Sequence, residues 1–564
     1  HDVLDIPLLN PAEPGEYRYD YFTYSNGSDK HRPEFGEGTA LISQPADASK
    51  YITNWNAWRK LYWGFDERQL PLNGRVWMPQ GDGPFPLVLI VHGNHTMEYF
   101  SDDGYAYLGE LLASRGMIAV SIDQNFLNYS HWSGIPNDNY LLRAWMLLQH
   151  IRQITNFTQD PGTPFYGKAD LHQIAIIGHS RGGQAAAMAA DAGKWFAKDH
   201  SLPVPGSYTI QAVIALAPTD VNVDDKAPRL SNVYYLLLHG GRDADVNTLK
   251  GDEQYARVKI TDPKRFKAAL FIADANHSFF NSSWGPHDQA MPRGIFLNQR
   301  DTMSREEQET VTKVYVSAFL EIVFHDKREY IPLFRDHHSA SNWLPDGRYA
   351  NRFQSGAIKL LTDFDQPDAM SVARYGSRLV ADWFSEWKVA NITNKNGYSK
   401  GTKGAILEYH DEAQLTVELS EQFREQVLDD EDTMLTFSIM NAEHELEWDV
   451  NEEISEEPEI HIEVETEEGD TFSVPLSDYV EISPMPETTY TTLPLIEDRL
   501  RNGKYKNNVT PVLQTVEIPL EDFQGPEDEL ELEPDELESI TFQFEDGPAK
   551  IVLDDIGFLP DPYL

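Results

Sequence analysis

Short apolar runs alternate with longer amphipathic segments over the first part of the chain. Apolar runs of strand length predict buried strands at Leu87–Val91, Met117–Ile122, Ile174–Ile177, Ala212–Ala217, Val233–Leu238 and Ala268–Ile272. Helices are predicted at Tyr105–Ser114, Asn139–Ile154 and Gln184–Ala190, and a capping box of Ser304 and Glu307 opens another that ends near Phe324. Tyr17–Tyr24 and Arg75–Met78 are expected as antiparallel edge strands. This alternation predicts an α/β fold with a doubly wound, mostly parallel sheet.

The pattern changes after Tyr330–Tyr349, a stretch rich in Pro, Asp and His that lacks periodicity, as a linker does. Short alternating segments follow at Gln414–Leu419, Met434–Met440, Glu459–Thr466, Thr515–Leu520, Ser539–Phe544 and Ile551–Leu553. Asp546-Gly547 lies between the last two as a hairpin turn signal. Strands without intervening helices indicate a β-sandwich. We therefore predict an α/β domain over residues 1–345 and an all-β sandwich over residues 346–564.

A sharp turn connects one predicted strand to one predicted helix. Gly178-His179-Ser180-Arg181-Gly182 fits the pattern G-x-S-x-G and follows the strand Ile174–Ile177. Glycines on both sides are needed because side chains there would collide. Ser180 would then present its Oγ above the carboxyl ends of the strands. A glycine- and serine-rich turn that matches by chance is the alternative, and the order of strand, motif and helix favours Ser180 as a nucleophile.

A serine nucleophile needs a base and a group that orients the base. In a sheet of this kind the acid and the histidine should follow in that order, each just past a strand end. Asp243 follows the strand that ends at Leu238, with Asp245 as a close competitor. Asp243 is favoured because an Asp soon after the strand with a Val three residues later is the usual pattern. His277 follows the strand that ends at Ile272 and is the predicted base.

The developing oxyanion needs two backbone N–H donors. We assign one to Arg181, the residue after the nucleophile, and the other to Asn94 in the loop after Leu87–Val91. Four further histidines lie near strand ends, and we expect them to shape loops: His92, His95, His179 and His239. The chain has no H-x-x-x-H or H-E-x-x-H spacing that would support a metal among them.

Composition narrows the classes of partner. The chain has 46 basic and 91 acidic residues, a net charge of −45, and such a surface repels nucleic acid and anionic lipid. It has no cysteine, which excludes disulfides, a cysteine-ligated metal and a cysteine nucleophile. No apolar run approaches the length of a membrane span. The chain opens at His1 rather than Met, which favours processing and export, so we expect a secreted protein.

Four segments together resemble the α/β-hydrolase superfamily: PLVLIVHGNH, IIGHSRGG, LHGGRDADV and ANHSFFN. The likeness covers roughly Leu72 to Phe324 and is nearest to the dienelactone hydrolase, chlorophyllase and PET-hydrolase-like branch. The resemblance implies hydrolysis of carboxylic esters through an acyl-enzyme, with no cofactor for catalysis. HGNH stands where many lipases and esterases have HGGG, so lipase-type acyl recognition does not carry over.

The rear segment, about Phe353 to Leu564, resembles the jelly-roll modules that occur as carbohydrate-binding modules. The motifs are LLTDFDQ, EIPLEDF, ITFQF and LDDIGF. The resemblance implies a structural calcium ion held by acids of the first and last strands, which match by position Asp363, Asp365, Asp554 and Asp555. Carboxylate oxygens suit calcium, but aspartate pairs in so acidic a chain are equally explained as solvated side chains.

In this superfamily a cap over the site commonly follows the strand that corresponds to Ala212–Ala217. The next strand begins at Val233, too soon for a cap. We therefore expect a serine hydrolase with an open site suited to bulky, polymeric or glycan-linked esters, and rim aromatics at Tyr99, Phe100, Trp132, Phe279 and Trp284. The alternatives are an amidase or peptidase with the same triad, and an inactive binding protein that keeps the hydrolase fold.

Overall fold

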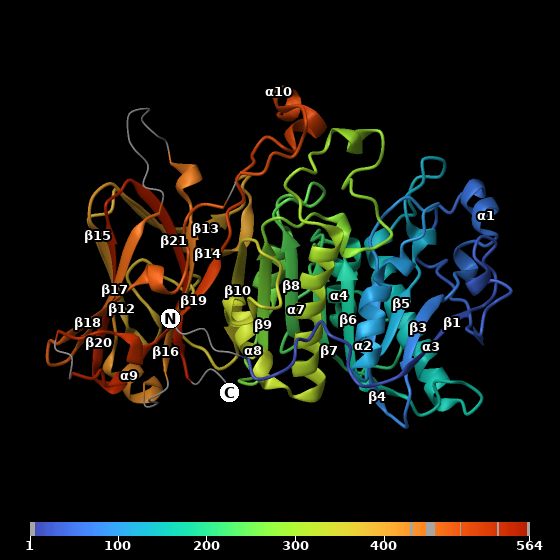
Figure 1. The fold of residues 1–564 in the computed structure, drawn as a ribbon, viewed down its shortest axis with the longest axis horizontal. Coiled ribbons are helices and arrows are strands. Elements are labelled where there is room, and N and C mark those ends of the chain that lie inside the picture. Colours follow the sequence, from blue (N-terminus) through green and yellow to red (C-terminus); the bar gives the residue numbers. More distant parts are fainter. Residues whose placement is uncertain (1–5, 429–432, 447–456, 486, 527–529, 561–564) are drawn as a thin grey trace.

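A computed structural model gives the fold and describes residues 6–428, 433–446, 457–485, 487–526 and 530–560. An α/β domain is followed by a β domain that lies beside it (Figure 1). The α-helices of the described residues are α1 Ala57–Trp63, α2 Ala106–Ser114, α3 Asn139–Gln159, α4 Arg181–Ala190, α5 Gly193–Phe196, α6 Gly251–Arg257, α7 Arg305–His325, α8 Ile331–Arg335, α9 Glu421–Val427 and α10 Pro494–Glu497. Among the described residues, no helix has both the length and the apolar character that crossing a bilayer requires.

The first sheet has ten strands in the order β10-β9-β8-β7-β6-β4-β5-β3-β1-β2. Strands β4 to β9 run parallel in its centre, and β3 and β10 flank them in antiparallel orientation. The strand bounds are β1 Tyr19–Ser25, β2 Leu41–Ile42, β3 Gly74–Pro79, β4 Phe85–Val91, β5 Ile118–Ile122, β6 Ala169–His179, β7 Ile210–Leu216, β8 Tyr234–Gly240, β9 Phe266–Ile272 and β10 Tyr349–Ser355. The mixed sheet is therefore parallel in the middle and antiparallel at both sides, as the alternating pattern predicts.

Both faces of this sheet are buried, which explains why its central strands are apolar without interruption. Leu87 and Leu89 of β4 belong to the apolar core that contains residues of α3 and α4. Val88 and Ile90, which point the other way, belong to the core that contains residues of α2 and α7. Successive side chains of a strand point to opposite faces, so one apolar run supplies both cores.

The end of the α/β domain differs from the predicted linker. Ser304 Oγ accepts from the Glu307 N–H at 3.1 Å and Ser304 N–H donates back to Glu307 Oε1 at 3.1 Å, so the predicted capping box opens α7. Residues 330–349, however, include α8, with Ile331 and Phe334 buried. Five helical residues are too few to show a helical period in sequence, which is why the segment resembled a linker.

Strand β10 lies just after the predicted domain boundary at 345/346, yet it pairs with β9 of the first sheet. Tyr349 lies opposite Ile272 and Ser355 opposite Phe266 in an antiparallel register. The residues directly after the predicted boundary therefore extend the sheet of the α/β domain. A strand pattern shows that a segment is extended, but not which sheet edge it joins.

The β domain has two antiparallel sheets that share one core. One sheet has the order β13-β14-β21-β16-β19, with β11 also on β21, and the other has the order β12-β15-β20-β17-β18. Phe437 and Phe542, from the two sheets, meet with ring centroids 5.0 Å apart. The strand bounds are β11 Lys359–Thr362, β12 Arg378–Asp382, β13 Glu386–Thr393, β14 Ser399–Tyr409, β15 Ala413–Glu418, β16 Met434–Asn441, β17 Glu459–Thr466, β18 Thr471–Pro475, β19 Gln514–Pro519, β20 Leu537–Glu545 and β21 Ala549–Leu559.

The turn at Asp546-Gly547 does not close a hairpin. β20 lies between β15 and β17 in one sheet, whereas β21 lies between β14 and β16 in the other. The turn therefore carries the chain from one sheet to the facing one, and the hairpin prediction was wrong. A turn signal marks where the chain reverses but not which strand becomes the hydrogen-bonded neighbour.

Candidate active site

Ser180 lies between the end of β6 and the start of α4, at the carboxyl edge of the parallel strands. Its φ of 58° and ψ of −120° belong to a region that a residue with a side chain adopts only when its surroundings hold it there. A Cβ at Gly178 would lie 2.0 Å from the carbonyl oxygen of Gly182, and a Cβ at Gly182 would lie 2.5 Å from that of Val91. Both glycines of the motif are therefore required by close backbone contact.

The loops after β8 and β9 bring Asp243 and His277 together. His277 Nδ1 donates a hydrogen bond of 2.7 Å to Asp243 Oδ2, and both side chains are buried. The other oxygen of Asp243 accepts from the N–H groups of Asp245 and Val246, at 2.9 and 2.7 Å. Asp243, the favoured acid of the sequence analysis, is thus fixed by its own loop and orients the ring of His277.

Asp245, the competing acid, contacts the other side of the same ring. Its Oδ2 lies 3.4 Å from His277 Nε2, and its side chain is 43% exposed. Gln289 Nε2 donates to its second oxygen at 3.3 Å. In the predicted triad Nε2 would be the nitrogen that takes the serine proton, so Asp245 contacts the ring on the side opposite to Asp243.

Nearby carboxylates determine the charge of His277. Burial lowers the pKa of His277, but Asp243, Asp245 and Asp288 raise it more, to about 9. Burial raises the pKa of Asp243, but the charge and hydrogen bond of His277 bring this pKa below its usual value. At pH 7 the pair is therefore an imidazolium and a carboxylate.

Asp288 joins the two loops that carry the histidine and the acid, and the sequence analysis missed it. Its Oδ2 accepts from the N–H groups of Ala244 at 2.9 Å and His277 at 3.0 Å. Its Oδ1 accepts from the N–H of Ser278 at 3.0 Å and from the Ser278 hydroxyl at 2.8 Å. In a chain with 91 acidic residues, no one-dimensional signal distinguishes this aspartate from its neighbours.

The loop after β4 reaches the serine turn closely. A Cβ at Gly93 would lie 2.7 Å from the Ser180 Cβ and 3.2 Å from the Arg181 nitrogen, so a glycine allows the two turns to touch. The Asn94 side chain points elsewhere, because its Oδ1 accepts from the N–H of Tyr129 at 2.9 Å. The backbone of Gly93 therefore lies against the backbone of Arg181, and the assignment of Asn94 and Arg181 as oxyanion donors stays a prediction.

Two of the neighbouring histidines hold these loops. The His179 ring lies between the Tyr105 hydroxyl and the carbonyl oxygen of His277, at 2.8 Å from each. Burial lowers the pKa of His179 far below its usual value, so its ring is neutral. His92 Nε2 accepts from the N–H of Gln124 at 2.8 Å. Both rings are bound as loop-shaping residues, as the sequence analysis expects.

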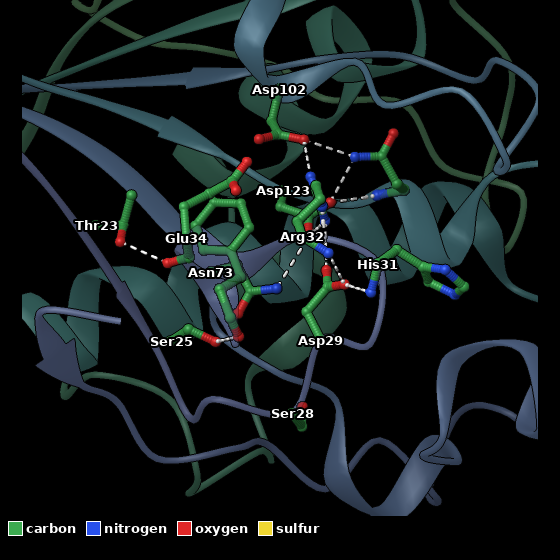
Figure 2. Close-up of polar contacts among 12 residues, drawn as sticks. Thr23, Ser25, Ser28, Asp29, His31, Arg32, Glu34, Asn73, Asp102 and Asp123 are labelled. Atoms are coloured by element: carbon green, nitrogen blue, oxygen red, sulfur yellow. Dashed lines mark hydrogen bonds and ion pairs between the residues drawn. The ribbon is translucent and has the colours of Figure 1, made fainter. Parts of the chain in front are cut away.

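Arg32, Asp102 and Asp123 form a buried ionic cluster (Figure 2). The Arg32 guanidinium lies 2.6 Å from carboxylate oxygens of both Asp102 and Asp123, and Arg75 Nε donates to Asp102 at 2.6 Å. Burial raises the pKa of Asp102, but the two arginines bring it far below its usual value. The residue after Asp123 is the one whose N–H binds the His92 ring, so the cluster fixes the loops that back the site.

Two of the four aspartates predicted to bind calcium have other side-chain partners. Asp363 pairs with Arg374 at 2.6 Å, and Asp554 accepts from the Thr402 hydroxyl at 3.0 Å. Among the described residues, ligand atoms of three acidic or histidine side chains come within 4.8 Å of one another in two groups: Asp336, His337 and His338, and Glu459, His461 and Glu545. Asp363, Asp365, Asp554 and Asp555 belong to neither group, so calcium binding there stays a prediction.

Residues 217–233 connect β7 to β8 without a helical cap. Of the expected rim aromatics, Tyr99 and Trp132 are 69% and 75% exposed. Trp284 is buried and stacks on His95 with ring centroids 5.1 Å apart. Of the aromatic residues expected at the rim, Tyr99 and Trp132 are therefore exposed, whereas Trp284 is packed in the interior.

The second domain also reaches the site. In Figure 1 the segment that carries α10 rises beside the loop that follows β9. Tyr505 OH donates to the carbonyl oxygen of Ala244 at 2.8 Å, and Asn247 Nδ2 donates to that of Lys504 at 2.7 Å. The loop that carries Asp243 is thus held in part by the β domain, which the sequence analysis did not predict.

Comparison with known proteins gives a short likeness. No family model matches the chain. Over 77 residues, 14% of the chain, it is 34% identical to proteins named esterase FrsA from Shigella boydii, Escherichia fergusonii and Escherichia coli. The matched segment covers 18% of the length of these curated relatives. The chain is thus similar to an esterase over a limited segment, which supports a hydrolase-like function in general terms.

Proposed function

We propose that the protein is an α/β-hydrolase that cleaves carboxylic esters with Ser180 as its nucleophile. The observation that carries the proposal is the buried 2.7 Å contact of His277 with Asp243, at the same sheet edge as the strained turn of Ser180. The three residues follow in the chain order serine, acid, histidine, each in the loop or turn after a parallel strand. The limited likeness to an esterase agrees with this chemistry.

In the proposed reaction Ser180 Oγ attacks the ester carbonyl carbon, and its proton passes to His277 Nε2. The N–H groups of Asn94 and Arg181 stabilise the oxyanion of the tetrahedral intermediate. The intermediate collapses, the C–O bond to the alcohol breaks, and the alcohol leaves with the proton from Nε2. Water then attacks the acyl-enzyme with His277 as base, and the carboxylic acid is released while Ser180 regains its proton.

Labelling with a fluorophosphonate probe, followed by peptide mass analysis, tests the nucleophile. We expect the label on Ser180 and no label on the Ser180→Ala variant. Because members of a triad act together, we also expect kcat to fall by a factor of about 10⁴ or more in both Ser180→Ala and His277→Ala. Ser207→Ala, which changes an exposed turn serine, is the matched control. Unchanged labelling or turnover in Ser180→Ala would refute Ser180 as the nucleophile, whereas no labelling and no turnover in the unmodified protein would favour the binding-protein alternative.

We further propose a bulky ester as the substrate, because exposed aromatic side chains lie near the Asn94 loop. The Trp58 and Trp132 rings are 5.8 Å apart and both are exposed, and Tyr129 binds the Asn94 side chain. Aromatic surfaces of this kind bind extended or cyclic substrates by stacking. Hydrolysis rates on p-nitrophenyl esters, matched anilides and polymeric esters would separate esterase from amidase activity and show whether size favours turnover.

A further inference from the structure

A pocket of 570 Å³ lies where the two domains meet beside the candidate site. One wall is the loop after β9, with Gln289 and Arg293, and the other is the segment around α10, with Arg499, Arg501 and Lys504. The walls are joined by the Thr492 N–H, which donates to the carbonyl oxygen of Phe296 at 2.8 Å. The volume is that of a small-molecule site, which is usually about 300 to 1,000 Å³.

The charge of this pocket is opposite to that of the whole protein. Four of its lining residues are basic, Arg293, Arg499, Arg501 and Lys504, in a chain whose net charge is −45. Lys504 Nζ lies 3.7 Å from Asp245, whereas the ion pairs among the described residues leave the three arginines without a carboxylate. In a chain with twice as many acidic as basic residues, grouped arginines without carboxylate partners are the feature to explain. Guanidinium groups bind carboxylates through paired hydrogen bonds.

The backbone holds one of these arginines in a strained turn. Arg501 and Asn502 have φ angles of 49° and 59°, in the left-handed region, and Gly503 continues it with 81°. Left-handed residues with side chains persist where the surrounding structure holds them, and they occur often at ligand sites. The Arg501 side chain is therefore presented from a defined turn rather than from a free loop.

The pocket borders the reacting nitrogen of His277. Gln289 and Lys504 both line the pocket, and both contact Asp245, at 3.3 and 3.7 Å. The other oxygen of Asp245 lies 3.4 Å from His277 Nε2. One residue thus separates the basic pocket from the position of the ester bond in the proposed reaction.

We propose that this pocket binds a carboxylate carried by the ester substrate at a distance from the bond that is cleaved. The proposal rests on the proposed function and adds the substrate class to it: esters whose acid or alcohol part is itself anionic. The net charge of the protein repels such a molecule, and the local basic pocket provides attraction where the substrate must be oriented. A bound anion also attracts Lys504 away from Asp245.

The experiment compares pairs of substrates. Half-esters of glutaric, suberic and sebacic acid with p-nitrophenol are each measured beside the neutral p-nitrophenyl ester of the same acyl length. The variant is Arg293→Gln/Arg499→Gln/Arg501→Gln, and the matched control is Arg300→Gln/Lys506→Gln, which removes exposed cations of the same two segments outside the pocket. We expect the ratio of kcat/KM for the anionic over the neutral ester to fall about tenfold or more in the variant, since charge-assisted hydrogen bonds are lost.

The outcomes separate the two proposals. A ratio that the pocket variant leaves unchanged, while the neutral ester is hydrolysed with Ser180, overturns the pocket proposal and leaves the esterase. Absence of hydrolysis of both esters together with absence of fluorophosphonate labelling overturns the proposed function. Calorimetric titration of glutarate into Ser180→Ala measures binding independently of turnover. If the three arginine substitutions, added to Ser180→Ala, leave the affinity for glutarate unchanged, the proposal that the pocket binds a carboxylate is also refuted. The melting temperature of each variant shows that the fold is retained.

Discussion

At the scale of single residues, the charge of His277 decides when the proposed reaction runs. A general base must be neutral to take the serine proton, and the pKa of His277 is raised to about 9. We therefore expect kcat/KM on a neutral ester to rise with pH and to level off only near pH 9. The charged pair of His277 and Asp243 contributes stability that is complete below pH 6.5 and is lost as the pH rises through about 9. A rate profile that is flat from pH 6 upward would contradict this.

Substitutions of Asp243 and Asp245 should have different effects on kcat and on its pH dependence. Asp243→Asn removes the group that orients the ring, so we expect a loss of about 10⁴ in kcat. Asp245→Asn removes a negative charge beside Nε2, which lowers the pKa of His277 and shifts the rise of kcat/KM to lower pH. The two pH–rate profiles check this directly. If Asp245→Asn shows the larger loss in kcat, Asp245 is the acid.

Asp288 should act as a positioning residue, because its carboxylate binds the loops of both His277 and Asp243. In Asp288→Asn one oxygen is replaced by an amide nitrogen that cannot accept, so we expect kcat to fall about 10 to 100-fold. Loss of the charge also lowers the pKa of His277, and a purely structural role would not move this pKa. The pH–rate profile measures it, with Asp301→Asn, an exposed loop residue, as the control. An unmoved profile with normal kcat would refute the role.

At the scale of elements, the serine turn depends on contact between three segments. A Cβ at Gly93 would meet Ser180, and a Cβ at Gly182 would lie 2.5 Å from the Val91 oxygen. We expect Gly93→Ala and Gly182→Ala each to destabilise the protein by about 1 to 3 kcal/mol and to reduce fluorophosphonate labelling, because backbone must shift to admit the methyl group. Gly193→Ala, at a position with open space, should leave stability and labelling unchanged. Urea unfolding and labelling rates measure both effects.

At the scale of the whole molecule, buried charged side chains connect the two domains. Lys400 of β14 pairs with Asp252 of α6 at 2.5 Å, and both side chains are buried. Removing the lysine leaves a buried carboxylate with the more distant Arg352, at 3.7 Å. We expect Lys400→Met to cost about 3 to 5 kcal/mol in the free energy of unfolding, whereas Lys403→Met on the same strand, exposed, costs little. If Lys400→Met and the unmodified protein gave the same unfolding curve, the contact between Lys400 and Asp252 would contribute no stability.

The contacts between the two domains also predict the result of removing the β domain. Deleting residues 356–564 would expose Leu249, Phe271 and Ala350, which share an apolar cluster with Met485 and Val512. It would also remove the segment that binds the Asp243 loop. We expect the truncated chain to hydrolyse short soluble esters more slowly and to have a lower melting temperature, because the β domain holds the loop that carries Asp243. Full activity of the truncated chain on p-nitrophenyl acetate would contradict this.

The order of strands and helices follows from the sequence alone, because uninterrupted apolar runs and amphipathic periods have different lengths and spacing. The placement of Ser180, Asp243 and His277 at one edge also follows, since the carboxyl ends of parallel strands meet there and each residue lies in the loop or turn after such a strand. Their chemistry as a triad stays a proposal to be tested. These features depend on local pattern and on a topology that has few alternatives.

Only the tertiary structure decided which distant segments meet. β10 joins the first sheet, β20 and β21 part into two sheets, and Asp288 closes the active loops. The basic pocket, with Arg293 and Arg501, brings together segments about 200 residues apart. No local pattern specifies such contacts, because the same strand or charged side chain satisfies its own propensity beside many different neighbours. The choice among neighbours is made by the packing of the entire chain.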